Sequence, residues 1–164
     1  MRGLKMKKLI SALIISLAAG SAPAWAQEVG GVVMGSLDDQ PLNCEIWPMQ
    51  SDFSGFGNTI TISITAHKCT GIEGLNQISV SFEKTGDAIG SVEIRLRGEG
   101  EALYSAPDSA IELLLANEAD GFLSLAGNAF AQVGPSDDYG TSIDMSVVQP
   151  LSISFSGIIE VLGH

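Results

Sequence analysis

The stretch Thr59-Ile60-Thr61-Ile62-Ser63-Ile64-Thr65 alternates polar and apolar side chains without a break. A period of two places successive side chains on opposite faces of an extended chain, so the isoleucines share one face and the hydroxyl residues share the other. β-Branched residues also suit a half-buried pleated surface. This stretch therefore predicts a β-strand with one buried face, and it sets the pattern for the rest of the chain.

The same alternation recurs after residues 59–65. Residues 78–83 and 92–97 repeat it, and residues 151–161 keep one apolar register over the longest strand candidate. Gly157 in that candidate predicts a bulge or the close approach of another backbone. Weaker strand candidates are residues 31–37, 42–47, 122–131 and 143–147, whereas residues 110–116 fit either a strand or a turn of helix.

Turn-forming residues separate these candidates, and no stretch keeps a helical period of 3.6 over three turns. Eight or nine short strands with frequent turns predict an all-β domain of mostly antiparallel strands. Its form would be a soluble β-sandwich or a small closed barrel. An outer-membrane barrel is disfavoured, because aromatic residues are few and most candidates are shorter than the about ten residues that such strands need.

The first 26 residues have the order of a secretory signal peptide. Four of the eight basic residues lie in the first eight positions, an apolar run covers residues 9–19, and Ala24-Trp25-Ala26 offers a cleavage site. The apolar run is about half of the roughly 20 residues that span a bilayer as a helix. We therefore expect residues 1–26 to be removed and residues 27–164 to form one periplasmic or secreted domain without an integral membrane span.

The charge of the chain restricts its partners. It has 8 Lys+Arg against 19 Asp+Glu residues and a net charge of −11. All acidic residues follow the predicted signal peptide, which leaves four basic and nineteen acidic residues in the mature chain, a net charge of −15. Because nucleic-acid binding needs a basic face that displaces counterions from phosphate, this charge argues against nucleic acid as a partner.

Cys44 and Cys69 are the only cysteines, and both lie in the part predicted to be exported. An even count in an oxidising compartment predicts one disulfide bond between them. In the chain-entropy model, closing a loop of this length stabilises the fold by about 3–4 kcal/mol. A redox pair would have its cysteines closer together, as in Cys-x-x-Cys.

Residues that carry catalytic chemistry are scarce. His67 and His164 are the only histidines, which excludes a three-histidine zinc site and leaves little for a catalytic triad. We therefore predict that the chain is not an enzyme and needs no cofactor. A hydrolase that uses two carboxylates stays as the enzymatic alternative, because such a pair leaves no local sequence signature.

Calcium is a weaker hypothesis that the acidic turns suggest. Oxygen ligands suit calcium, but neither acidic turn matches the calcium-loop pattern, and Asp commonly begins turns by bonding to its own backbone. The candidate ligands are Asp38, Asp39, Asp137 and Asp138.

Residues 44–57 combine turn-forming residues with large apolar side chains, so they either fold beneath the core or expose a binding patch. The candidate patch consists of Trp47, Met49, Phe53 and Phe56. The leading hypothesis is a non-enzymatic binding or interaction module for an unknown protein or small ligand, with a monomer as one option. The alternative is a structural subunit of a surface or envelope assembly that pairs through an edge strand, with residues 151–161 as the candidate.

Overall fold

The computed structural model describes residues 30–161, so the predicted signal peptide lies outside the described residues. In chain order the elements are β1 (Gly30–Leu37), β2 (Gln40–Ile46), the 3-10 helix η1 (Pro48–Gln50), β3 (Asp52–Phe56), β4 (Thr59–Thr70), β5 (Leu75–Thr85), β6 (Ala88–Gly98), β7 (Leu103–Ser105), β8 (Ala110–Ala119), β9 (Phe122–Pro135) and β10 (Gln149–Val161). The all-β prediction is confirmed, but the described residues form ten strands in place of eight or nine, and six of them are longer than predicted, with 10 to 14 residues. Residues 30–161 contain no helix with the length and apolar character to cross a membrane.

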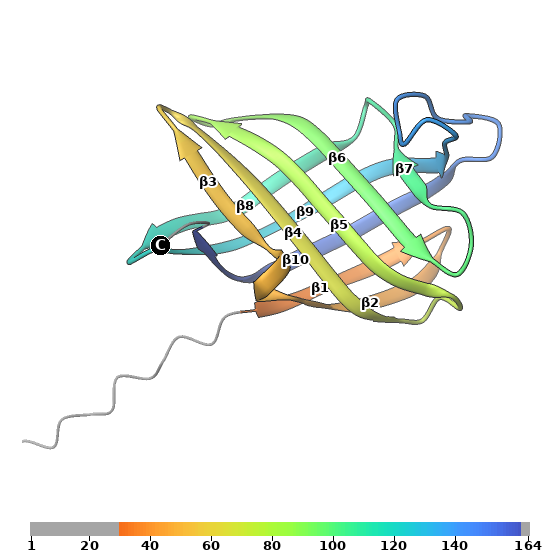
Figure 1. Ribbon diagram of the computed structural model, residues 1–164, viewed down its shortest axis with the longest axis horizontal. Coiled ribbons are helices and arrows are strands. Elements are labelled where there is room, and N and C mark those ends of the chain that lie inside the picture. Colours follow the sequence, from red (N-terminus) through yellow and green to blue (C-terminus); the bar gives the residue numbers. More distant parts are fainter. Residues whose placement is uncertain (1–29, 162–164) are drawn as a thin grey trace, which may run out of the picture.

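The strands form one sheet that closes on itself (Figure 1). Ladders join β1 to β2, β2 to β4 and β4 to β5, and they continue through β6, β7, β9 and β10 back to β1. All of these ladders are antiparallel, and the short contact of β3 with β10 is parallel. Two forms were predicted from the sequence, a two-sheet sandwich and a closed sheet, and the closed sheet describes this strand pairing.

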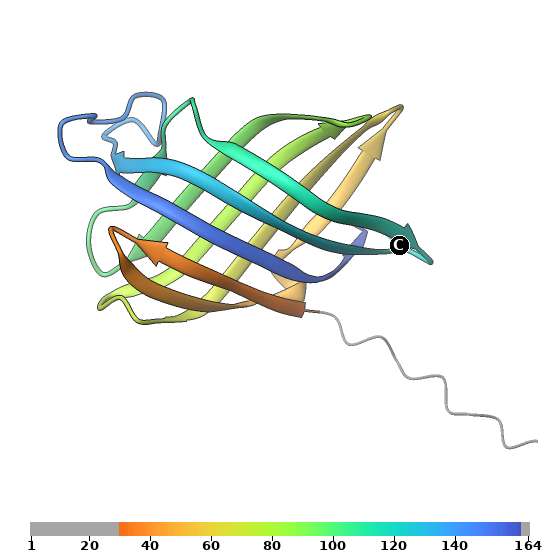
Figure 2. The ribbon, with the colours of Figure 1, turned by 180° about the vertical axis from the view of Figure 1, so that it is seen from behind.

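At two positions around the ring, two successive strands pair with the same neighbouring strand. β2 and β3 both pair with β4, on either side of η1, and β7 and β8 both pair with β9, on either side of residues 106–109. Within residues 30–161 no ladder joins β8 to β6, so the outer edge of β8 has no strand partner. In Figure 2, β8 forms the upper border of the sheet that faces the viewer.

The interior is filled by one set of alternating side chains. Ile62 and Ile64 of β4 are fully buried, as the opening stretch of the sequence predicts, and their neighbours of the other set point outward. Across the interior, the rings of Phe82 on β5 and Phe155 on β10 lie 6.2 Å apart between centroids. Burying a side chain of this size contributes about 1.5–3 kcal/mol, so this core is the main source of stability.

β10 is an inner strand of the sheet. It pairs with β1 along one edge and with β9 along the other, so residues 151–161 have no free edge for assembly. That part of the assembly hypothesis is wrong. The close approach predicted at Gly157 is confirmed, because a Cβ there would lie 2.5 Å from the carbonyl oxygen of Gly30. Both ladders run through Gly157 without a bulge.

The strand predicted at residues 143–147 is wrong, because these residues belong to the loop between β9 and β10, residues 136–148. The carboxylate of Asp144 accepts hydrogen bonds from the Ser146 amide at 2.9 Å and from the Ser146 hydroxyl at 2.6 Å. Such side-chain bonds offer the backbone a turn in place of a ladder. Residues 110–116, which fit either a strand or a helical turn, lie in β8.

Candidate functional site

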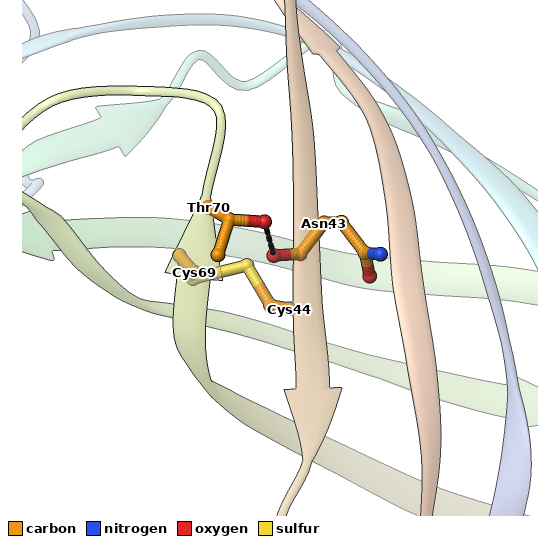
Figure 3. The surroundings of a disulfide bond; sticks show 4 residues. All are labelled: Asn43, Cys44, Cys69 and Thr70. Carbon is orange, nitrogen blue, oxygen red and sulfur yellow. Dashed lines mark hydrogen bonds between the residues drawn. A yellow bond between two sulfur atoms is a disulfide. The ribbon is translucent and has the colours of Figure 1, made fainter.

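The predicted disulfide bond between Cys44 and Cys69 is confirmed (Figure 3). It joins β2 to β4, and the Thr70 hydroxyl beside it donates a hydrogen bond of 3.4 Å to the Asn43 carbonyl oxygen. The cross-link therefore holds β2 against β4 at a point where their ladder changes register. Trp47, the first residue of the candidate site, follows Cys44 by three positions in the sequence.

The four predicted patch residues do not form one surface. Met49 and Phe56 are almost fully exposed, Trp47 is 38% exposed and Phe53 is buried in the core. The prediction that Phe53 lines an exposed patch is therefore wrong, because it faces the interior as the second residue of β3. β3 carries the chain away from η1, so Phe56 lies at the opposite end of β3 from Trp47 and Met49 (Figure 1).

Trp47 is fixed on the outer face of the sheet. Its amide donates a hydrogen bond of 2.9 Å to the Thr65 carbonyl oxygen, and its ring lies 4.5 Å from the ring of His67 between centroids. The His67 ring in turn shares a 2.6 Å hydrogen bond with the Gln50 side chain. Where η1 interrupts the ladder, the Ser51 hydroxyl accepts a bond from the Thr65 amide and donates one to its carbonyl oxygen.

A row of residues extends across the outer face from Trp47, whose amide bonds to Thr65, and the members from Thr65 onward are directly paired. The row runs from β4 to β7 through Thr65, Ser79, Arg95 and Tyr104. Paired residues on β4, β5 and β6 flank it on both sides: Ser63, Ser81 and Glu93 on one side, and His67, Gln77 and Arg97 on the other. Since neighbouring strands lie about 4.8 Å apart, the row measures about 19 Å from Trp47 to Tyr104.

A groove of about 430 Å³ lies over the part of this row from Thr65 to Tyr104, and we call it the outer groove. Hydroxyl side chains dominate its lining, and of the residues that the structure describes Glu93 supplies the only carboxylate and Arg95 the only guanidinium. The lining hydroxyls of serine and threonine belong to Ser63, Thr65, Ser79, Ser81, Ser105 and Thr141. The outer groove therefore offers many hydrogen-bond donors and acceptors and little charge.

The loop of residues 136–148 forms one wall of the outer groove, and Asp138 holds its first part together. The Asp138 carboxylate accepts hydrogen bonds from the Ser142 hydroxyl at 2.6 Å, the Ser142 amide at 2.8 Å and the Ser136 hydroxyl at 2.8 Å. These bonds, with the Ser142 hydroxyl first, lower the pKa of Asp138 from 3.8 to about 2. The pKa of Asp144 is also lowered, chiefly by the Ser146 hydroxyl.

Tyr139 projects from this loop at the rim of the outer groove. Its backbone is left-handed, with φ of 59°, and its side chain is 87% exposed. The following Gly140 lies against Tyr104, where a Cβ would come within 2.7 Å of the Tyr104 ring. A bulky residue in this conformation costs free energy and persists only where its surroundings hold it, as often happens at functional sites.

The four candidate calcium ligands lie in two separate loops. Asp38 and Asp39 form the turn between β1 and β2, both with positive φ, as Asp does in tight turns. Asp138 uses its oxygens on the serines of its own loop, and Asp137 lines a separate pocket with Glu101 and Asp144. Among residues 30–161, no three His, Cys, Asp or Glu side chains are grouped so that they could hold a metal ion.

Comparison with known proteins gives no match: no family model fits the chain, and neither a curated protein nor a solved structure is similar to it. The proposals below therefore depend on the geometry of this chain alone.

Sequence reasoning found Trp47, at the end of the row, but missed the residues that line the outer groove. These residues come from strands and a loop between Ser63 and Thr141, and only the pairing register brings them together. One signal was present in the sequence. The polar faces of the strands at residues 59–65 and 78–83 carry hydroxyl groups at every position but Glu83, where charged residues usually cover a solvated face.

Proposed function

We propose that the chain is an exported, non-enzymatic binding module and that the outer groove is its binding site. The observation that carries this proposal is the row from Trp47 to Tyr104, which has an aromatic side chain at each end and Thr65, Ser79 and Arg95 between them. Binding sites commonly combine aromatic surfaces with a few convergent polar groups in a concave region. Tyr139 adds a third aromatic ring at the rim.

The ligand that suits this groove is an extended, uncharged molecule rich in hydroxyl groups, such as a linear oligosaccharide. Its hydroxyls would exchange hydrogen bonds with the serine and threonine side chains, and its apolar faces would pack on the aromatic rings. The acidity of the mature chain disfavours anionic ligands. A peptide strand has no place here, because β4 and β5 are paired along both edges beneath the groove.

Binding without hydrolysis is the function that the lining supports best. Hydrolysis of a glycosidic bond by two carboxylates needs an acid on each side of the bond, commonly about 5–9 Å apart. Among residues 30–161, Glu93 is the only carboxylate that lines the outer groove. We therefore expect an oligosaccharide to be bound and released unchanged.

Fluorescence of Trp47 tests the proposal. In a Trp25→Phe chain Trp47 is the only tryptophan, so its emission reports on one site, beside Thr65 at the end of the row. Titration with neutral linear hexasaccharides of glucose and of N-acetylglucosamine is expected to give a saturable change for at least one of them. The products are then analysed by mass spectrometry, and intact sugar is expected.

Matched aromatic substitutions locate the binding. Tyr139→Ala removes a ring at the rim and is expected to weaken binding about three- to tenfold, the range for one aromatic contact. Phe56→Ala removes an equally exposed ring outside the groove and is expected to leave affinity unchanged. Equal losses in both variants, or no response of Trp47 to any neutral hexasaccharide, would contradict the proposal.

A further inference from the structure

The outer edge of β8 has no strand partner among residues 30–161. β8 covers Ala110–Ala119, and its only ladder in this part of the chain is the one with β9 on the inner side. β6, the next strand of the ring, pairs with β7 over Arg95 and Leu96 and with no residue of β8 in the described part of the chain. The backbone N–H and C=O groups along this edge therefore lack strand partners, which makes the edge a template for another chain.

β8 also lacks the residues that usually protect such an edge. Its sequence, AIELLLANEA, contains neither Lys nor Pro, and Leu114 and Leu115 expose 64% and 49% of their surface. One protective feature is present, a bulge at Leu114 where the register with β9 shifts. The bulge divides the edge into two segments. An added strand would pair either with the segment before Leu114 or with the segment after it.

The charges around β8 indicate what kind of chain can add to it. Residues 98–164, which include β7 to β10, contain ten acidic residues and no Lys or Arg. The four basic residues of the mature chain all lie on β4, β5 and β6. On β8 itself, Glu112 and Glu118 lie on either side of the bulge. A second copy of this chain would bring two acidic sheets edge to edge, and like charges placed opposite each other destabilise strand pairing.

We propose that β8 is a docking edge for an extended, basic segment of a partner protein, which adds as a further strand beside β8. Main-chain hydrogen bonds to the free edge would supply affinity, as in other cases of strand addition. Lys or Arg residues of the segment would meet Glu112 or Glu118, which the bulge places on opposite faces of the sheet, and apolar residues would cover Leu114 and Leu115. This site lies on a different strand from the outer groove, so it is independent of the binding function proposed there.

Two designed peptides test the proposal by amide hydrogen exchange. One is a ten-residue peptide that alternates Val with Lys and Thr, and the other carries Glu in place of every Lys. The Lys peptide is expected to slow exchange at alternate amides of β8, the ones that point away from β9, and the Glu peptide is expected to leave them unchanged. Protection of amides elsewhere, or equal protection by both peptides, overturns the proposal.

A matched pair of variants separates docking on β8 from general attraction to an acidic protein. Leu115→Lys and Met34→Lys add the same charge at sites of similar exposure, 49% and 46%, but β1 is paired along both edges. Leu115→Lys is expected to weaken binding of the Lys peptide up to about fivefold and Met34→Lys to leave it nearly unchanged. Equal weakening by both, or a concentration-dependent dimer with protected β8 amides in ultracentrifugation and exchange, overturns the proposal.

Discussion

Asp138 organises the wall of the outer groove, although its carboxylate is exposed to solvent. Its oxygens receive hydrogen bonds from two serines on opposite sides of Tyr139 in the sequence, and this closes the loop around the tyrosine. Because these bonds require the charged carboxylate, they keep the pKa of Asp138 near 2. One ionised side chain thus sets the conformation of the exposed ring that we place at the binding site.

The loop is therefore expected to loosen only in strong acid. A carboxylate with a lowered pKa stabilises the folded loop at any pH above its ordinary pKa of 3.8, and this contribution is lost as the pH falls through about 2. Ser142→Ala removes the largest cause of the shift, so the pKa of Asp138 should move up toward 3.8 and the loop should loosen at higher pH. Carboxyl NMR titration of Asp138 measures this directly, with Ser146→Ala as a control that shifts Asp144 instead. An unchanged Asp138 titration in Ser142→Ala would contradict the assignment.

Gly157 shows how much one strand depends on the absence of a side chain. β10 lies between β1 and β9, and a Cβ at position 157 would meet the backbone of β1 at 2.5 Å. Gly157→Ala is expected to lower the free energy of unfolding by about 1–3 kcal/mol, because backbone atoms must move to relieve the overlap.

Gly90→Ala is the matched control for this substitution. Gly90 also lies within a strand, β6, but a Cβ there meets no atom within 4 Å. The free energy of unfolding of the Gly90→Ala variant should stay the same or rise slightly, because Ala loses less conformational freedom than Gly on folding. Urea unfolding of both variants provides the measurement, and equal losses would show that space at position 157 is not the cause.

Strands with one buried face were predictable from the sequence, because burial of one face places an apolar side chain at every second position. Residues 59–65, 78–83 and 92–97 all lie within observed strands. The prediction failed where local side-chain bonds override periodicity, as Asp144 does at residues 143–147. Phe53 shows a second limit, since an apolar residue in a turn-rich segment can face either way until the register of β3 with β4 is known. The outer groove could not be predicted, because it depends on register across several ladders.

At the scale of the whole molecule, the disulfide bond fixes a place where the closed sheet depends on a short ladder. β2 pairs with β4 at only three positions, and the bond between Cys44 and Cys69 lies within that ladder. The disulfide bond therefore joins two parts of the ring covalently. One part contains β1 and β10, and the other contains β4, β5 and β6.

Removing the disulfide is expected to destabilise the protein without changing its fold. In a Cys44→Ala/Cys69→Ala variant the free energy of unfolding should fall by about 3–4 kcal/mol, the value for a cross-link that closes a loop of this length. Urea unfolding measures the loss, and adding a reductant to the unsubstituted protein should reproduce most of it. A loss well below 1 kcal/mol in both would mean that the ladder from β2 to β4 holds without the cross-link.

The pairing of β1 with β10 also determines when folding can be completed. Gly30 pairs with Ile158 and Leu37 with Leu151, so the ladder that closes the ring joins segments from opposite ends of the described chain. Until β10 has been synthesised, β1 and β9 have no strand between them and the interior stays open to water. Contacts between such distant segments form slowly, because the loop between them must first be closed. A chain with this topology folds completely only after its last strand has been made, which is compatible with the export that we propose, because an exported chain crosses a membrane before it folds.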